Sequence, residues 1–190
     1  MRIGLLGGSF DPPHVGHRLA ASDAFEALEL DRLIWLPAAN QPLKTRQEVT
    51  AAGHRLAMVR LAVDGDPRFE VSTIEIDRGG LSYTVDTLAA LADCWPSATL
   101  FWLAGADVLT SFQRWREPER IAQLATVVVL RRSGEGADVS GMPAGTQALA
   151  TRRVDVSSTE IRERVRAGKS IRGFVPDAVA EYIAAERLYR

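Results

Sequence analysis

The sequence contains little cysteine, almost no excess charge and no long apolar run. A single cysteine, Cys94, excludes an intramolecular disulfide and a four-cysteine zinc site and suits a reducing compartment. Because 23 basic residues balance 24 acidic ones, we expect neither nucleic acid nor a membrane surface as a partner. No segment approaches the length of a membrane span, and the apolar run before Gly7 is too short for a secretory signal. We therefore expect a cytoplasmic protein.

The size and composition of the chain are those of one ordinary globular unit. Hydrophobic residues make up 46% of the chain and charged residues 25%, which is typical of folded rather than disordered or fibrous proteins. A chain of 190 residues can bury one complete core, so we expect a single domain over residues 1–190. A helical C-terminal part at about residues 157–190 should pack on it. The sequence leaves the choice between a monomer and a homodimer open.

Strand-like and helix-like segments alternate along the sequence. Short apolar runs predict buried strands at residues 3–6, 33–36, 100–103 and 127–130. Between them, apolar residues recur at the three- and four-residue spacing of one helix face. Since a parallel crossover needs a dozen or more residues and usually contains a helix, this alternation predicts an α/β fold. We expect a Rossmann-like, doubly wound parallel sheet with helices on both faces and a short helical C-terminal part.

Local signals add detail to this prediction. Thr50 is a possible cap for a second helix whose apolar stripe includes Leu56, and residues 69–76 look extended. The segment 133–145 contains four glycines and little apolar periodicity, which predicts a surface loop. Pro176 should open the last helix.

The segment from Gly7 to His17 has the residues of a phosphate-binding site. It lies between a predicted strand and a predicted helix, where open α/β sheets bind ligands. The adjacent Gly7 and Gly8 let a ligand approach the backbone, and the first N–H groups of the helix favour anions. If the helix begins near His14, then His14 and His17 share one face and can both contact one polyphosphate. Imidazole donors suit a leaving pyrophosphate, whose charge grows as the bond to the α-phosphorus breaks.

Each of these residues has a plainer explanation when it is taken singly. Glycines make tight turns and histidines are often ordinary surface residues, although the combined spacing favours the phosphate site. A zinc site is the other alternative, but the spacing is not His-Glu-x-x-His, and His54 and Cys94 are the remaining soft ligands. The segment also lacks the Gly-Lys-Ser/Thr of a Walker loop and the Gly-x-Gly-x-x-Gly of a dinucleotide fold.

The segment from Gly7 to His17 resembles the signature of the HxGH nucleotidyltransferase superfamily. In that family the two histidines and the helix start hold the triphosphate, which implies catalytic roles for His14 and His17. Related phosphopantetheine adenylyltransferases usually carry threonine at the position of His14. The ATP-binding residues that the resemblance implies are Gly7, Gly8, Ser9, Phe10, His14, His17, Gly105, Asp107, Ser157, Ser158 and Arg162.

A second helix start lies near the end of the sequence. Ser157 and Ser158 place hydroxyl groups there, and Arg162 follows about one turn later. Residues 152–172 contain seven basic and three acidic residues, so a capped helix with a solvated charged face is the plainer interpretation. The stretch nevertheless resembles the SSTxIR motif of the superfamily, which implies that Ser157, Ser158 and Arg162 contact the β- and γ-phosphates.

Residues 79–88 predict a turn that leads into a helix, where Thr84 can serve as a cap. This stretch resembles the SYTxxTL motif of bacterial nicotinate-nucleotide adenylyltransferases, which holds the nicotinate end of the acceptor in that family. The resemblance implies that Tyr83 and Thr84 bind the mononucleotide. Backbone N–H donors favour a carboxylate over an amide, which gives a physical basis for choosing nicotinate over nicotinamide.

The resemblance implies roles for residues farther along the chain as well. Gly105 and Asp107 would lie near the adenosine, and Trp115 would stack on the pyridine ring, although a tryptophan is more often a core residue. Arg116 departs from the pattern, because many relatives have a second aromatic residue there. Charged residues that either bind the mononucleotide phosphate or are simply exposed are Lys44, Arg131 and Arg132.

The reaction that the resemblance implies joins ATP and nicotinate mononucleotide to give nicotinate adenine dinucleotide and pyrophosphate, in NAD biosynthesis. The mononucleotide phosphate would attack the α-phosphorus directly, with the triphosphate stabilised by His14 and His17. Mg²⁺ would be held mainly by the ATP phosphates and water, without protein ligands. Two alternatives remain open: the same chemistry on nicotinamide mononucleotide or phosphopantetheine, and a non-catalytic regulator that binds ATP.

Overall fold

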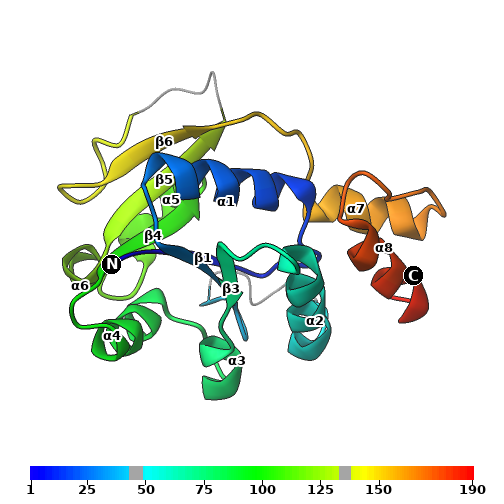
Figure 1. The fold of residues 1–190 in the computed structure, drawn as a ribbon, viewed down its shortest axis with the longest axis horizontal. Helices are drawn as coiled ribbons and strands as arrows, with labels where there is room; N and C mark the ends of the chain where they lie inside the picture. Colours follow the sequence, from blue (N-terminus) through cyan, green and yellow to red (C-terminus); the bar gives the residue numbers. More distant parts are fainter. Residues whose placement is uncertain (43–48, 133–137) are drawn as a thin grey trace.

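The computed structural model describes residues 1–42, 49–132 and 138–190, with the backbone alone at Arg132 (Figure 1). Within these ranges one parallel sheet has the strand order β3-β2-β1-β4-β5-β6. Its strands are β1 (Arg2–Gly8), β2 (Arg32–Pro37), β3 (Phe69–Val71), β4 (Thr99–Gly105), β5 (Thr126–Arg132) and β6 (Gln147–Thr151). This is the strand order of the doubly wound Rossmann fold, so the predicted fold class is confirmed.

Both faces of the sheet are buried. In the two strands that flank β1, Ile34 and Trp102 lie on one face, whereas Leu33 and Phe101 lie on the other. Successive side chains of a strand point to opposite faces, so a strand that is covered on both sides is apolar at every position. This is why the central strands stand out in the sequence as continuous apolar runs.

Helices cover the two faces of this sheet. They are α1 (Val15–Ala27), α2 (Ala52–Val63), α3 (Ile74–Arg78), α4 (Thr84–Cys94), α5 (Val108–Ser111), the 3-10 helix η2 (Phe112–Arg114) and α6 (Pro118–Leu124), and they are followed in the chain by two further helices, α7 (Ser158–Arg166) and α8 (Asp177–Ala185). Ala24 of α1 and Val59 of α2 pack in the apolar cluster on one face. Leu88 of α4 and Ile121 of α6 pack in the cluster on the other. Figure 1 shows α1 and α4 on opposite sides of the strands.

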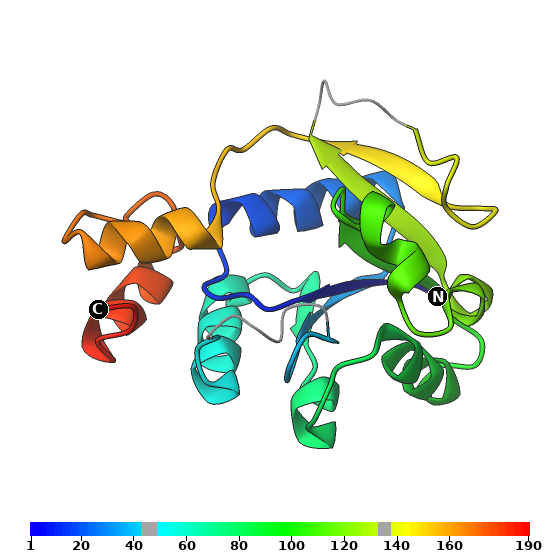
Figure 2. The ribbon, with the colours of Figure 1, turned by 180° about the vertical axis from the view of Figure 1, so that it is seen from behind.

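The last two helices pack on α2 rather than on the sheet. Met58 of α2, Ile161 of α7 and Val179 of α8 belong to one buried apolar cluster. In both ribbon views α7 and α8 lie together at one end of the molecule, and α7 lies next to the start of α1 (Figures 1 and 2). This packing brings the start of α7 to the loop that precedes α1.

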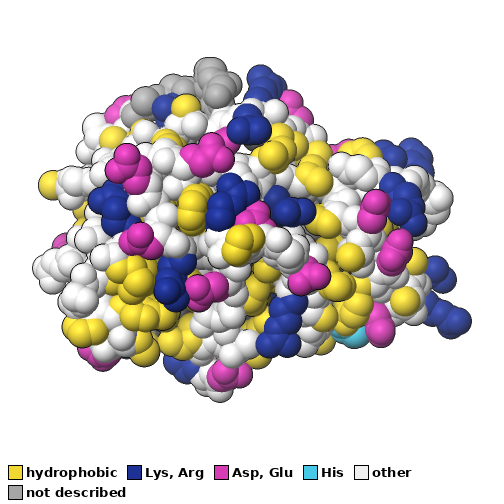
Figure 3. Space-filling model, viewed as in Figure 1, with side chains coloured by type: hydrophobic (Ala, Val, Ile, Leu, Met, Phe, Trp, Pro, Cys, Tyr) yellow, Lys and Arg dark blue, Asp and Glu magenta, His cyan; other side chains and the backbone are white. Residues whose placement is uncertain are grey.

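Charges of both signs are mixed on the surface. Figure 3 shows basic and acidic side chains interspersed with apolar ones on the face that it draws. Within the described ranges, no helix is both long and apolar enough to cross a membrane. Because basic and acidic side chains are mixed on the surface, tight binding of an anion must depend on local geometry rather than on overall charge.

Some local predictions are wrong. The N-cap of α2 is Ala51 rather than Thr50, whose backbone N–H instead donates to the Asp11 side chain (3.1 Å). Residues 69–76 are not one extended segment, because β3 is followed by the short helix α3 within them. The buried face of α2 includes Arg55, whereas Leu56 is only half-buried.

Strand β6 is an element that the sequence pattern does not reveal. It forms the edge of the sheet, and Gln147, Ala148 and Ala150 are exposed. An edge strand is defined by its backbone hydrogen bonds to one neighbour and needs no continuous apolar run.

The strand order determines where a ligand can bind. After β1 the chain continues toward β2, whereas after β4 it continues toward β5, on the other side of the sheet centre. The connections therefore diverge at the carboxyl ends of these two neighbouring strands. In open α/β sheets such a switch point leaves a crevice that binds ligands.

Candidate active site

Two adjoining cavities occupy this switch point. The larger one has a volume of about 660 Å³ and extends from β1 and α1 toward α7. The smaller one, of about 410 Å³, extends toward α3, α4 and α6. Gly7, Gly8, Gly105 and Asp107 line both of them. Two ligands bound side by side would therefore meet at the ends of β1 and β4.

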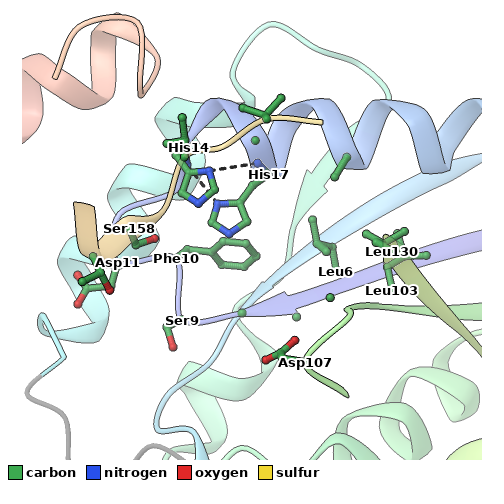
Figure 4. A pocket seen from close by; sticks show the side chains of 18 of the residues that line it. Leu6, Ser9, Phe10, Asp11, His14, His17, Leu103, Asp107, Leu130 and Ser158 are labelled. Atoms are coloured by element: carbon green, nitrogen blue, oxygen red, sulfur yellow. Dashed lines mark hydrogen bonds between the residues drawn. The ribbon is translucent and has the colours of Figure 1, made fainter. Parts of the chain in front are cut away.

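His14 and His17 form a stacked pair on the wall of the larger cavity (Figure 4). Their ring centroids are 3.7 Å apart and the rings are inclined by 23°. His14 is the N-cap of α1, and its Nδ1 accepts a hydrogen bond from the backbone N–H of His17 (3.4 Å). The Nδ1 of His17 in turn accepts from the backbone N–H of His14 (3.2 Å). The two histidines thus cap the helix reciprocally, in the manner of a capping box.

This reciprocal capping determines where each imidazole carries its proton. A neutral imidazole has one donor and one acceptor nitrogen, and here Nδ1 is the acceptor in both rings. In the neutral form of each ring, the proton is therefore on Nε2. The pair can donate two hydrogen bonds from the positive end of a helix, an arrangement that favours an anionic ligand.

Phe10 supports the histidine pair from below, as Figure 4 shows. Its ring lies edge-on to that of His17, with a centroid distance of 5.2 Å, and contacts Trp35 at 5.1 Å. Phe10 has φ of +49°, a left-handed conformation that is uncommon outside glycine. Gly16 leaves room for the pair, because a Cβ at this position would lie 3.0 Å from Nδ1 of His14.

The start of α7 closes the far end of the larger cavity. Ser158 and Arg162 line it, as the motif implies, but both side chains also bind the loop that precedes α1. The Ser158 hydroxyl donates to the backbone carbonyl of Pro12, and the Arg162 guanidinium donates to that of Asp11. Both hydrogen bonds are 2.8 Å long. Ser157 is the N-cap of α7, where its hydroxyl accepts from the N–H of Glu160 (3.1 Å), and it is not among the lining residues.

The smaller cavity brings together three of the predicted mononucleotide residues, Tyr83, Thr84 and Trp115. Tyr83 is the N-cap of α4 and Thr84 is the first residue of the helix, so the prediction that Thr84 caps it is wrong. Arg116 also lines this cavity, and its guanidinium lies 4.9 Å from the centroid of the Tyr83 ring. The cation of Arg116 thus stacks on the Tyr83 ring.

The other predicted mononucleotide residues are placed differently. Arg131 is a buried residue of β5 and is not among the residues that line either cavity. Arg132 ends β5, and its side chain lies outside the described part of the structure. Lys44 also lies outside the described residues. The phosphate-binding roles of these three residues remain predictions.

A buried carboxyl on the wall of the smaller cavity is not predicted from the sequence. Glu75 is 4% exposed and accepts a hydrogen bond from the Thr87 hydroxyl (2.8 Å), to which Arg78 also donates (2.8 Å). Burial raises the pKa of Glu75, while hydrogen bonds from Thr87 and Ser82 and the charge of Arg78 oppose the rise. The network connects α3 with the first turns of α4 and thereby supports Tyr83 and Thr84. A glutamate in a predicted extended segment gives no signal of burial.

Sequence reasoning also assigns no role to Asp11, Arg55 or Tyr189. Asp11 lies within the HxGH-like segment, and its carboxylate accepts a hydrogen bond from the Tyr189 hydroxyl (2.6 Å). Arg55 could have been noticed as a basic residue beside the apolar stripe of α2. Nothing in the sequence pairs Tyr189 with Asp11, since 178 residues separate them.

Comparison with known proteins identifies the class first. A family model described as cytidylyltransferase-like matches residues 5–164. The doubly wound sheet, with a histidine pair capping the first helix at its switch point, thus belongs to a nucleotidyltransferase of this family.

Curated relatives narrow the class. A probable nicotinate-nucleotide adenylyltransferase of Gemmatimonas aurantiaca is 53% identical over 100% of this chain and 93% of its own length. One from Thermus thermophilus is 47% identical over the whole of both chains. The chain belongs to the nicotinate-nucleotide adenylyltransferases, so the predicted family and enzyme class are confirmed.

Solved structures agree with this fold. The nicotinic acid mononucleotide adenylyltransferase of Plasmodium falciparum, complexed with NaAD, has a TM-score of 0.84 at 17% identity and covers 99% of this chain and 97% of its own. A putative nicotinate-nucleotide adenylyltransferase of Vibrio parahaemolyticus has a TM-score of 0.72 at 21% identity, over 100% of this chain and 95% of its own. At 17% and 21% sequence identity, these similarities show a shared fold and no more.

Proposed function

We propose that this protein joins ATP and nicotinate mononucleotide to give nicotinate adenine dinucleotide and pyrophosphate, as a step of NAD biosynthesis in the cytoplasm. The proposal rests on one observation above all: two cavities of nucleotide size adjoin at the switch point, and the larger contains the stacked pair His14 and His17. The names of relatives at 53% and 47% identity support the choice of the acceptor. Two nucleotides bound in these cavities would place their reacting phosphates where the cavities adjoin, near Gly7 and Gly8.

The chemistry needs no covalent intermediate. An oxygen of the mononucleotide phosphate attacks the α-phosphorus of ATP and forms a new P–O bond. The bond between the α-phosphorus and the oxygen that bridges it to the β-phosphorus breaks. The electron pair of that bond leaves with pyrophosphate. Since the attacking phosphate is already ionised at neutral pH, no general base is required, and catalysis depends on alignment and charge stabilisation.

The histidine pair suits the departure of pyrophosphate. Because Nδ1 of each ring accepts a backbone N–H, the Nε2–H groups are the donors that can bind phosphate oxygens. Negative charge grows on the leaving group in the transition state, so donors fixed in advance stabilise it more than they stabilise bound ATP. Arg162 and the first N–H groups of α7, including that of Ser158, would add donors at the end of the triphosphate near α7.

The smaller cavity suits a pyridine carboxylate. Trp115 offers an aromatic face for stacking. The first N–H groups of α4, next to Tyr83 and Thr84, favour a carboxylate over a neutral amide. Lys44, Arg131 and Arg132 remain candidates for the mononucleotide phosphate on the basis of sequence.

Magnesium fits this site as a companion of the substrate. Among the described residues, no three His, Cys, Asp or Glu side chains converge on a possible metal position. Mg²⁺ commonly keeps several water ligands and binds substrate phosphates, so this chain would hold it largely through ATP and water. When bound, it would neutralise part of the triphosphate charge.

One assay tests the proposal against its alternatives. The protein is offered ATP and Mg²⁺ with nicotinate mononucleotide, nicotinamide mononucleotide or phosphopantetheine in turn, and pyrophosphate release is followed. We expect the highest kcat/KM with nicotinate mononucleotide. Release with phosphopantetheine alone would refute the proposed acceptor. ATP binding without release from any acceptor would instead indicate a regulator.

A further inference from the structure

Asp11 places a carboxylate on the wall of the larger cavity, where the triphosphate would bind. A negative side chain beside a polyanion opposes binding unless its charge is compensated. Asp11 is 6% exposed, and one of its oxygens accepts a hydrogen bond from the Tyr189 hydroxyl (2.6 Å). The other oxygen accepts from the backbone N–H of Thr50 (3.1 Å). The carboxylate is therefore bound on both sides by donors from distant parts of the chain.

Arg55 lies near this carboxylate but is committed to other acceptors. Its side chain is 2% exposed, and each of its three nitrogen atoms donates to a backbone carbonyl. These carbonyls belong to Thr50 (2.8 Å), Ser9 (2.9 Å) and Ala39 (2.9 Å). Burial lowers the pKa of Arg55, and the nearby charge of Asp11 opposes this lowering. Among the described residues, the direct hydrogen-bond donors to the Asp11 carboxylate are thus Tyr189 and Thr50.

Tyr189 reaches Asp11 from the segment after α8. Arg187 and Tyr189 have φ of +53° and +65°, which non-glycine residues rarely adopt. Such conformations persist where surrounding contacts hold them, and they cluster at functional sites. Burial, followed by the hydrogen bond to Asp11, raises the pKa of Tyr189 above its ordinary value of 10.0. The hydroxyl therefore keeps its proton at neutral pH and remains a donor.

We propose that Tyr189 is a positioning residue of the triphosphate site, whose hydroxyl holds the Asp11 carboxylate in place and stabilises it by a hydrogen bond. This contact keeps the loop between β1 and α1 in the conformation that binds a nucleoside triphosphate. Docking of the segment after α8 is thereby coupled to ATP binding. The inference rests on the proposed function, because it concerns the site assigned to ATP.

Tyr182 provides a matched control. It lies on α8, and its hydroxyl is hydrogen-bonded to Nδ1 of His54 in α2 (2.8 Å). Like Tyr189, it joins the C-terminal helical part to the rest of the molecule through a phenol. Neither Tyr182 nor His54 is among the residues that line the two cavities.

The test compares Tyr189→Phe with Tyr182→Phe in the full chain. ATP affinity is measured calorimetrically with Mg²⁺, KM and kcat are measured for both substrates, and thermal unfolding is recorded. We expect Tyr189→Phe to raise the Kd and KM of ATP about tenfold, the scale of one lost hydrogen bond to a charged group, with little change in the KM of the mononucleotide. Tyr182→Phe should leave both KM values unchanged.

A rescue experiment separates this hydrogen bond to the carboxylate from general structural support. If Tyr189 acts by holding the Asp11 carboxylate, adding Asp11→Asn removes the negative charge that Tyr189→Phe leaves without this donor, and ATP affinity should return to within about twofold of Asp11→Asn alone. Equal and additive losses in the double variant would contradict the proposal. So would Tyr189→Phe binding ATP as tightly as the wild type, or raising both KM values in parallel with Tyr182→Phe.

The same measurements distinguish this inference from the proposed function. Wild-type protein that binds ATP but releases no pyrophosphate with nicotinate mononucleotide would refute the acceptor, while the ATP titrations would still decide the role of Tyr189. Wild-type protein that does not bind ATP would overturn both.

Discussion

The two adjoining cavities are built in different ways. The larger one takes most of its polar groups from residues 7–17 and from the start of α7, where hydrogen bonds hold His14, His17 and Ser158. The smaller one is assembled from separate segments spread between Gly7 and Ile121, with a tryptophan, a tyrosine and a stacked arginine on its walls. The larger cavity depends on the geometry of helix starts, and the smaller cavity depends on side-chain packing.

This difference separates how the two sides should respond to substitution. Donors aimed at developing charge act mainly in the transition state, so losing one should reduce turnover. Aromatic walls bind the ground state and the transition state alike, so losing one should raise KM. The substitutions below test this contrast, from the largest expected effect to the smallest.

Replacement of His17 should have the largest effect. His17→Ala removes one Nε2 donor and also the Nδ1 acceptor of the His14 backbone N–H. We expect kcat to fall by a factor on the order of 10² to 10³. The KM of the mononucleotide should change little, which steady-state kinetics with both substrates would measure. His54→Ala is the control, because that histidine bonds Tyr182 outside both cavities. Near-normal turnover of His17→Ala would remove His17 from the mechanism.

Replacement of Trp115 should act on the acceptor alone. Trp115→Ala removes the aromatic wall of the smaller cavity, and the KM of nicotinate mononucleotide should rise about tenfold, the scale of one aromatic contact. The KM of ATP should stay nearly constant. Trp115→Phe retains a ring and should recover most of the affinity. A loss confined to ATP binding would contradict the placement of the acceptor.

Replacement of Arg116 should have a smaller effect of the same kind. Arg116→Ala removes the cation that stacks on Tyr83, and the KM of the mononucleotide should rise about two- to fivefold, as expected for an exposed cation–π contact. Arg120→Ala, an exposed arginine of α6 that pairs with Glu117, is the matched control. If both variants behave alike, the stacking on Tyr83 has no part in acceptor binding.

The buried carboxyl of Glu75 should be visible in the pH dependence of stability. Burial raises its pKa in the folded protein above the ordinary value of 4.5, so the folded state holds the proton more tightly than the unfolded state. The stability that this group contributes is present below the unfolded pKa and is lost as pH rises through the folded pKa. Glu75→Gln has no carboxyl group to ionise at this position, so it should not lose stability in this way as the pH rises.

Thermal unfolding from about pH 4 to pH 8 would measure the effect. The melting temperature of Glu75→Gln, relative to the wild type, should rise with pH across this range. Glu119→Gln, at an exposed position of α6, should show no such trend. A constant difference between Glu75→Gln and the wild type would show that the carboxyl has the same pKa in both states.

The sequence predicts the triphosphate side better than the acceptor side. His14, Gly16 and His17 lie within one short stretch between a strand and a helix, so their mutual geometry follows from local backbone structure. Ser158 and Arg162 are recognisable by motif, but their hydrogen bonds to the carbonyls of Pro12 and Asp11 cross the molecule and have no local signal.

On the acceptor side the pattern names residues without placing them. Tyr83, Thr84 and Trp115 line the smaller cavity, yet the helix cap is Tyr83 rather than Thr84, and Arg131 lines neither cavity. Helix boundaries depend on contacts beyond the local sequence, so a cap can be misplaced by one position. Side-chain direction at the end of β5 depends on register, which apolar content alone does not reveal.

By itself, the sequence of residues 7–17 determined a strand end, a helix start and two histidines on one face of that start, because these features depend on neighbours within a few residues. Only the tertiary structure decided what surrounds that segment. The order of the strands opens the crevice, the packing of α7 and α8 on α2 brings Ser158, Arg162 and Tyr189 to the loop, and Arg55 is buried beneath it. These contacts join residues far apart in the chain, and they form only because burying apolar faces brings those segments together.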